Sequence, residues 1–483
     1  MRRSGLGLAA GLLVFASLPP RGWWVAGLLA VAVLSAALSG LPARQRALVG
    51  AATGVGWFVP ALAWVYHFSA PGYLLLAAGQ ALLLAGVCAL CWRWWGLPAL
   101  LVAFTAVRDR VPFGGFPLAG VELGQVGGPG LWAAPLFGAL GVVAAVALAG
   151  TGLAAVARDR RRPGPGLLAA LAAGALVLGG ALLPPDTGGP RLRVAVVQGG
   201  GPRGVPAVRA DSAAVLARQL EVTRRLRAGQ VDLVVWPEDV VALDRPLNEA
   251  SPEGDAVAEQ ARRLRVPLLV GVVEPAGARR FRNAAVLFDA GGAVAGRYDK
   301  VHRVPFGEYV PGRSVLRRLV DLSLLPADAV PGRRAGLIQA GGQPLGVVIS
   351  YEVFFSDRTR AAVRAGGRLL LLPTNAASYT GSAVPAEEIA ASRLRARETA
   401  RWLVQAAPTG YSAVVDSAGS VRQRSQLGQP ALLTATVGLS DRPTPYTIWG
   451  DLPMLATALV LAAGASPLRR CSSGLSTWWP CRS

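Results

Sequence analysis

Eight apolar stretches, most of them joined by short loops, constrain the fold of this 483-residue chain more than any other feature of its sequence. A helix needs about 20 mostly apolar residues to cross the hydrocarbon core of a bilayer. The stretches therefore predict seven N-terminal membrane spans and one C-terminal span, the fifth being short enough to continue as a re-entrant piece. They lie at residues 5–18, 23–39, 47–68, 72–92, 97–107, 131–155, 166–183 and 448–466.

Arginines in the connecting loops predict the orientation, because Lys and Arg are retained on the cytoplasmic side of a membrane. Two spans separate each basic loop from the next, so all of these loops fall on the cytoplasmic side. The loops contain Arg2, Arg44, Arg93 and the cluster that begins at Arg158. The long block between the seventh and eighth spans is then extracytoplasmic. We expect a membrane domain at 1–188, a catalytic domain at 189–446, a C-terminal span at 447–467 and a cytoplasmic tail at 468–483.

The extracytoplasmic block alternates short Val- and Leu-rich runs with longer, arginine-bearing segments. Such runs are typical of strands buried on both faces, and the alternation predicts an α/β layered fold with helices covering the sheets. The predicted strands are 191–198, 231–237, 267–273, 284–290, 345–350, 368–373, 402–407 and 412–417. The predicted helices are 208–228, 253–265, 356–366 and 385–400.

Several site classes are excluded by residue counts. The chain has only two histidines, His67 and His302, so a histidine-rich metal site is excluded and a Ser-His-Asp triad is disfavoured. Its four cysteines lie outside the block, which therefore has no disulfide. The GxGxxG string at 199–204 resembles a dinucleotide fingerprint, but prolines interrupt it and no acidic residue follows a second strand. We expect no cofactor and no metal.

Three strings in the block carry candidate catalytic residues. Glu238 ends VVWPE and projects from a sheet edge into a cleft or solvent. Lys300 is the only lysine of the chain, which otherwise uses arginine, so a compact ammonium has been kept there. Ser350 ends a strand before a predicted helix, where free amides can face an oxyanion. Singly, a solvated carboxylate, a surface lysine and a helix N-cap are the plainer interpretations.

The combination of strings resembles a known family. The chain resembles the nitrilase (carbon–nitrogen hydrolase) superfamily, which has a Glu-Lys-Cys triad on an α-β-β-α sandwich. The resemblance lies in three strings in this order: WPE, DKVHRVPFGEYVP and a strand ending in SYE. Within that superfamily the chain resembles the apolipoprotein N-acyltransferase family most specifically. This narrower resemblance lies in the flanking spans and in the strings VPFGGFP, FRNAAVLF, PTNAA and WGDLP. It covers nearly the whole chain and implies a multi-pass protein of a bacterial plasma membrane. The block has serine where the family has cysteine, and TNAAS lacks the family's usual aspartate and tryptophan.

The resemblance implies roles for single residues. Glu238 is the general base, Lys300 stabilises the tetrahedral intermediate, Ser350 is the nucleophile, and the supporting residues are Glu308, Tyr351 and Glu352. Activation of Ser350 has two alternatives: Glu238 takes its proton with Lys300 nearby, or Lys300 is itself the base.

The implied reaction moves an acyl chain from a membrane phospholipid, through an acyl-enzyme, to the N-terminal amine of a diacylglyceryl-cysteine lipoprotein. The net charge of +21 suits anionic membrane lipids, and no nucleic-acid partner is expected. Two alternatives stay open. A hydrolase of the same fold would use water as acceptor, and a non-catalytic membrane scaffold would explain the missing cysteine.

Overall fold

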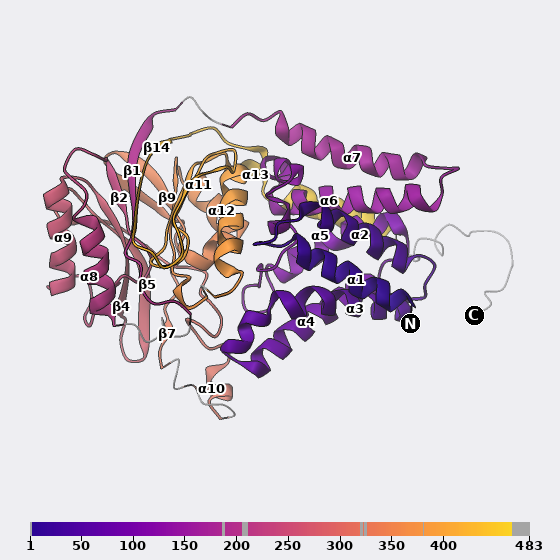
Figure 1. Cartoon of the computed structure of the whole chain (residues 1–483), viewed down its shortest axis with the longest axis horizontal. Coiled ribbons are helices and arrows are strands. Elements are labelled where there is room, and N and C mark those ends of the chain that lie inside the picture. Colours follow the sequence, from indigo (N-terminus) through magenta and orange to yellow (C-terminus); the bar gives the residue numbers. More distant parts are fainter. Residues whose placement is uncertain are drawn as a thin grey trace.

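The computed structural model describes residues 2–185, 189–204, 211–318, 322, 326–379 and 381–465. These residues form two bodies side by side, a bundle of helices and a layered α/β domain (Figure 1). The chain enters the bundle at its N-terminus, crosses to the α/β domain after α7, and returns to the bundle as α14. The predicted tail at 468–483 and its two cysteines lie outside the described residues.

Each predicted span in the bundle is a helix. The helices are α1 (Arg2–Ser17), α2 (Trp24–Leu38), α3 (Ala43–Ala61), α4 (Ala70–Ala89), α5 (Leu97–Arg108), α6 (Ala134–Arg158), α7 (Gly164–Ala181) and α14 (Leu452–Ala465). Among the described helices, three are long and apolar enough to cross a membrane by length and composition, in the segments 70–89, 129–158 and 164–181. The last helix begins later than predicted, because Gly450 (φ 64°) separates it from the short α13 (Pro445–Trp449).

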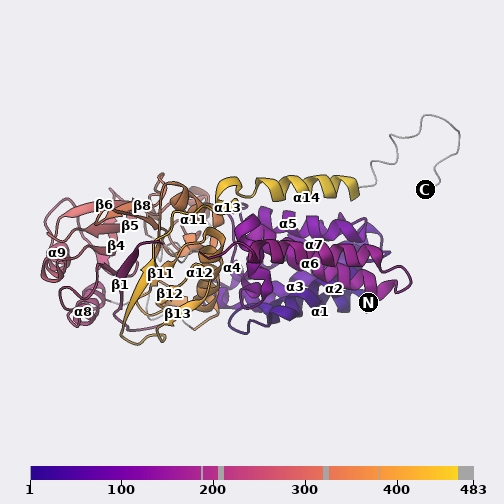
Figure 2. The ribbon, with the colours of Figure 1, turned by 90° about the horizontal axis from the view of Figure 1, so that it is seen from above.

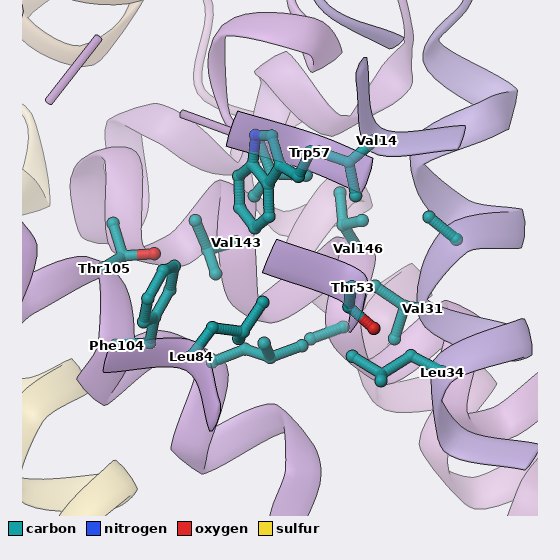
Figure 3. Close-up of a pocket in the computed structure, with 14 residues that line it drawn as sticks. Val14, Val31, Leu34, Thr53, Trp57, Leu84, Phe104, Thr105, Val143 and Val146 are labelled. Carbon is teal, nitrogen blue, oxygen red and sulfur yellow. The ribbon is translucent and has the colours of Figure 1, made fainter. Parts of the chain in front are cut away.

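Small residues let the bundle helices approach closely. A Cβ on Gly11 of α1 would lie 2.0 Å from the carbonyl oxygen of Thr53 on α3, and one on Gly54 would lie 2.4 Å from Cα of Ala81 on α4. Such close backbone contact is typical of membrane helices. Figure 3 shows the cavity that remains inside the bundle, lined among others by Val14, Thr53 and Trp57.

The α/β domain has four layers. One sheet has the order β14-β1-β2-β4-β5-β6, with β3 beside β4 and β7 beside β5, and the other has the order β13-β12-β11-β10-β9-β8. The strands of the first sheet are β1 (Arg191–Gln198), β2 (Leu233–Val235), β3 (Val241–Ala242), β4 (Leu268–Pro275), β5 (Arg280–Phe288), β6 (Val294–Asp299), β7 (Asp328–Ala329) and β14 (Ala431–Gly438). Those of the second are β8 (Leu337–Ala340), β9 (Gln343–Val347), β10 (Leu370–Pro373), β11 (Leu403–Ala406), β12 (Ala413–Val415) and β13 (Val421–Arg424).

Two pairs of helices cover the outer faces of the sheets. The helices α8 (Ser212–Thr223) and α9 (Pro252–Leu264) share an apolar core with the first sheet. The helices α11 (Ser356–Arg364) and α12 (Val384–Thr399) cover the second sheet. A further core fills the space between the sheets. The predicted α/β layering is therefore confirmed as an α-β-β-α sandwich, and the α12 layer faces the helix bundle (Figures 1 and 2).

The sequence missed several elements of this domain. The strands β6, β8, β13 and β14 were not predicted, because they are exposed or follow turns that break the Val-Leu pattern. Helix α8 is shorter than the predicted 208–228, of which 208–210 lie outside the described residues. Within the predicted strand at 231–237 only Leu233–Val235 form β2, and hydrogen bonds to β4 continue as far as Pro237, which has no N–H to donate.

Candidate active site

Three segments of the sandwich meet where strands of both sheets end. Glu238 follows β2, Lys300 follows β6, and Ser350 lies just after β9. Gly271 of β4 makes room for the turn that carries Glu238, because a Cβ at Gly271 would lie 2.4 Å from the Cα of Glu238. Only glycine fits at that crossing, since real Cβ atoms essentially never approach so closely.

Lys300 contacts two of the three carboxylates that the sequence singled out. Its Nζ lies 2.8 Å from Oε1 of Glu238 and 2.9 Å from Oε1 of Glu308. Asn283 of β5 donates from Nδ2 to the same two oxygens, at 2.7 Å and 3.0 Å. Glu238 and Lys300 are each only 2% exposed, so Glu238 does not face open solvent. The lone lysine of the chain is therefore enclosed between two acids.

The electrostatics of this cluster separate the roles of its members. Burial by itself would lower the pKa of Lys300, but Glu238 and Glu308 outweigh burial and raise that pKa above its ordinary value. Burial raises the pKa of Glu238, and the nearby Lys300 opposes that rise. Lys300 therefore stays a cation at neutral pH, which favours Glu238 over Lys300 as the proton acceptor.

Ser350 stands in a strained turn. Its φ of 51° lies in the left-handed region, which residues other than glycine seldom adopt and which often marks functional turns. Ser350 opens a short 3-10 helix, Ser350–Phe354, which was not predicted, and α11 begins at Ser356, where the sequence predicted a helix to begin. The tight turn intervenes because Glu352 captures the N–H of Ile349, at 2.8 Å.

Glu352 links the Ser350 turn to the Lys300 segment. Its Oε1 accepts hydrogen bonds from the backbone N–H groups of Val301, at 2.7 Å, and His302, at 3.0 Å. The Tyr298 hydroxyl lies 2.9 Å from both carboxylate oxygens. Because Glu352 is fully buried, these bonds are shielded from water. A buried carboxylate thus connects the turn of Ser350 to the segment that follows Lys300.

The other supporting residues hold the edges of the site. Glu308 accepts a hydrogen bond on Oε2 from the Val304 N–H at 2.7 Å, which closes the loop after Lys300. The Tyr351 hydroxyl donates to the carbonyl oxygen of Gly115, in the bundle, at 3.1 Å. The residue after the candidate nucleophile therefore contacts the membrane domain directly.

Sequence reasoning missed three members of the cluster. Asn283 stands in the quoted string FRNAAVLF but was not singled out. Asp239 follows Glu238 in a left-handed conformation (φ 58°), is hydrogen-bonded to Asn375, and has a pKa raised by burial and by Glu238. Glu388 of α12 accepts hydrogen bonds from Thr374 and from Gln405, and burial raises its pKa to about 8. Its helix gave no catalytic signal in the sequence.

The family comparisons agree with this geometry. Residues 193–443 match the carbon–nitrogen hydrolase family, and residues 10–152 match the apolipoprotein N-acyltransferase N-terminal domain. The yeast Saccharomyces cerevisiae Nit3, a nitrilase-superfamily protein, has a TM-score of 0.41 and 20% identity, covering 51% of this chain and 90% of that one.

Relatives of full length are found as well. An apolipoprotein N-acyltransferase of Mycolicibacterium smegmatis is 32% identical over 95% of this chain and 83% of its own length. One from Azotobacter vinelandii is 31% identical over 96% of this chain and 95% of its own. The match over residues 193–443 places the chain in the carbon–nitrogen hydrolase class, here joined to a helical N-terminal domain. The chain belongs to the apolipoprotein N-acyltransferase family and is an acyltransferase enzyme.

Proposed function

We propose that this enzyme transfers an acyl chain from a membrane phospholipid, through an acyl-enzyme on Ser350, to the N-terminal amine of diacylglyceryl-cysteine lipoproteins. The observation that carries the proposal is the buried contact of Lys300 with Glu238 and Glu308, tied through Glu352 to the strained turn of Ser350. The names of the full-length relatives support the lipoprotein acceptor.

The first step forms the acyl-enzyme. Oγ of Ser350 attacks the ester carbonyl carbon of the phospholipid, and its proton passes to the carboxylate of Glu238. The Lys300 ammonium stabilises the oxyanion that develops on the carbonyl oxygen. The bond between the acyl carbon and the glycerol oxygen then breaks, and that oxygen takes the proton from Glu238 as the lysophospholipid leaves.

The second step uses the free amine of the lipoprotein. Its nitrogen attacks the acyl carbon of the Ser350 ester and passes a proton to Glu238. The carbon–Oγ bond breaks, Oγ recovers that proton, and the amide product departs. An ester is higher in free energy than an amide, so the transfer is downhill, although an oxyester reacts more slowly with amines than a thioester.

A serine nucleophile places a greater demand on the base than a cysteine. A free thiol has a pKa of about 8.5, whereas the pKa of an alcohol is far higher. Burial supports this role by raising the pKa of Glu238, which strengthens it as a base. The fixed cation of Lys300 lowers the cost of the charge that forms as the proton leaves.

The membrane arrangement is part of the proposal. We take helices α1–α7 as seven spans and α14 as an eighth, with the sandwich on the extracytoplasmic face of the plasma membrane. The boundaries at residues 188 and 446 are supported by the run of the chain out of α7 into β1 and back through α13 into α14. In this proposed arrangement the site lies beside the outer leaflet, where both lipid substrates lie.

Mass spectrometry of the purified protein incubated with phospholipid tests the proposal, beside Ser350→Ala and Ser350→Cys. We expect an acyl mass increment on the Ser350 peptide, absent from the alanine variant and carried by the thiol in the cysteine variant. An adduct on the cysteine variant alone would contradict the serine acyl-enzyme and favour the scaffold. Release of free fatty acid without acylation of a lipoprotein peptide would favour the hydrolase.

A further inference from the structure

One loop of the helix bundle reaches into the sandwich beside the site. It follows α5, and we call residues 113–119 the 113–119 loop. Trp57 of α3 anchors one end by donating from Nε1 to the Ala119 carbonyl oxygen at 2.9 Å. In the middle of the loop the Phe116 N–H donates to the carbonyl oxygen of Arg108, the last residue of α5, at 2.7 Å. The loop is thus fixed to the bundle at its C-terminal end and at its middle.

The backbone of this loop is held in conformations that are costly for most residues. Phe113 (φ 57°) and Ala119 (φ 58°) are left-handed without being glycine. A Cβ on Gly115 (φ 102°) would lie 2.1 Å from the carbonyl oxygen of Asp109. A loop that keeps such strain is over-determined by its surroundings, which is common near functional sites.

Three hydrogen bonds join the loop to three separate elements of the sandwich. The Tyr309 hydroxyl donates to the Phe113 carbonyl oxygen at 3.1 Å, and the Tyr351 hydroxyl donates to that of Gly115 at 3.1 Å. The Ala119 N–H donates to Oε2 of Glu387 on α12 at 2.8 Å. The loop therefore contacts the segment after Lys300, the Ser350 turn and the helix α12 at once.

Each sandwich partner is the direct chain neighbour of a residue in the site. Tyr309 follows Glu308, and Tyr351 follows Ser350. Glu387 precedes Glu388, which lies close enough to Glu238 and Lys300 for their charges to act on its pKa. One strained loop thus touches the chain beside a supporting carboxylate, the nucleophile and a buried acid.

We propose that the 113–119 loop is a three-point clamp that positions the active site on the membrane domain, with Tyr309, Tyr351 and Glu387 as its positioning residues. The inference rests on the proposed function of Ser350. Misplacement of reacting groups by about 1 Å can cost on the order of 100-fold in rate, so a clamp at these three points acts on the chemistry itself.

Single hydroxyl deletions in the full-length protein test the clamp. Tyr309→Phe and Tyr351→Phe each remove one hydrogen bond and keep the ring, and Tyr73→Phe is the matched control. Tyr73 donates to the carbonyl oxygen of Val59 at 2.9 Å within the bundle, away from the loop. Acylation of Ser350 is measured with a phospholipid in vesicles and with p-nitrophenyl acetate, a small water-soluble ester that needs no membrane.

We expect each clamp variant to lower kcat roughly five-fold with both donors, the value of one hydrogen bond of about 1 kcal/mol, with KM for the soluble ester unchanged. Tyr73→Phe retains the native rates. Unchanged rates in both clamp variants would overturn the proposal. So would a loss confined to the phospholipid, because the loop would then only dock the two domains.

The third contact has its own pair of variants. Glu387→Gln keeps an oxygen that accepts the Ala119 N–H, whereas Glu387→Met leaves that buried N–H without its partner. We expect the methionine variant to lose kcat with both donors and the glutamine variant to stay near native. Equal loss in both variants would contradict a role through this hydrogen bond.

A separate readout keeps the clamp testable if Ser350 forms no acyl-enzyme. In the Ser350→Cys background, the rate at which iodoacetamide alkylates the new thiol is followed by peptide mass spectrometry, with and without Tyr309→Phe and Tyr351→Phe. Slower alkylation in the clamp variants would support the clamp even where the proposed function fails. Equal rates would overturn the clamp while leaving the acyl-enzyme untouched.

Discussion

The helix bundle and the sandwich place their apolar side chains in opposite ways. In the bundle, large apolar residues lie on the outside, including Leu82 of α4 and Leu168 of α7, each 68% exposed. In the sandwich, the residues between the two sheets, such as Val196 and Val404, are fully buried. The same apolar residue types are therefore exposed in one part and buried in the other, since burial of leucine away from lipid gives no gain in free energy.

Buried charged residues in the sandwich lie at the candidate site and at the junction with the bundle. The sandwich buries several charged groups beside an opposite charge, at the Lys300 cluster and along α12, where Arg395 lies 2.8 Å from Glu398. Helix α12 is enclosed because it lies between the second sheet and the bundle (Figure 2). Arg397 of α12 donates to the Gly180 carbonyl oxygen, at the end of α7, at 2.6 Å. The contrast shows that polar groups are gathered where the chemistry and the domain junction require them.

The largest effect is expected from breaking the buried charge cluster of the sandwich. Lys300→Met leaves Glu238 and Glu308 enclosed without a cation. Removing one partner of a buried ion pair costs roughly 3–5 kcal/mol. We expect Ser350 acylation to fall to the level of Ser350→Ala and the melting temperature to drop. Lys300→Arg keeps the charge but should still lose most activity, because a planar guanidinium does not replace a compact ammonium. Native activity in Lys300→Met would refute the role of the cluster.

A smaller effect should separate the two outer surfaces. Leu82→Arg in α4 places a charge toward lipid and should cost about 2.5–3.5 kcal/mol. Val294→Arg in β6, where the side chain is 50% exposed, should change stability by no more than about 0.5 kcal/mol. Membrane insertion yield and thermal unfolding of the two variants provide the measurement. Equal tolerance of both substitutions would contradict a lipid-facing surface on α4.

The smallest effect concerns the pH dependence of the buried acid Glu388, whose pKa is raised to about 8 mainly by burial. In the unfolded chain a glutamate ionises near pH 4.3, so between about pH 4.3 and 8 the folded state binds more protons. Folding stability must therefore fall as pH rises through this window. Glu388→Gln should flatten this fall, which is measured as melting temperatures from pH 5 to 8. The same slope in the variant would assign the effect to other groups.

Much of the site was predictable because its residues follow strands. Glu238 and Ser350 each follow a Val-rich run that was predicted as a buried strand, whereas Lys300 was singled out as the only lysine of the chain. Glu308 was predicted as a supporting residue through the resemblance, and its carboxylate lies 2.9 Å from Nζ of Lys300. The first members of the cluster could therefore be predicted from the local sequence.

Other members were not predictable from local sequence. Asn283 comes from β5, and Glu388 comes from a helix of the opposite layer; neither spacing nor composition marks them. Asp239 stood beside Glu238 and gave no signal, because its burial depends on segments far along the chain, including Asn375. The short 3-10 helix before α11 was also not predicted, since the turn at Ser350 is fixed by the side chain of Glu352.

By itself the sequence determined the two-part plan of this protein, because hydrophobic length and strand-helix alternation are local properties of the chain. It also determined which residue types stand at the strand ends. Only the tertiary structure decided the charge state of Lys300, the burial of α12 and the contacts of the 113–119 loop. These properties depend on which residues, distant in sequence, lie together in a site with little water. There each neighbouring group changes the free energy of a buried charge.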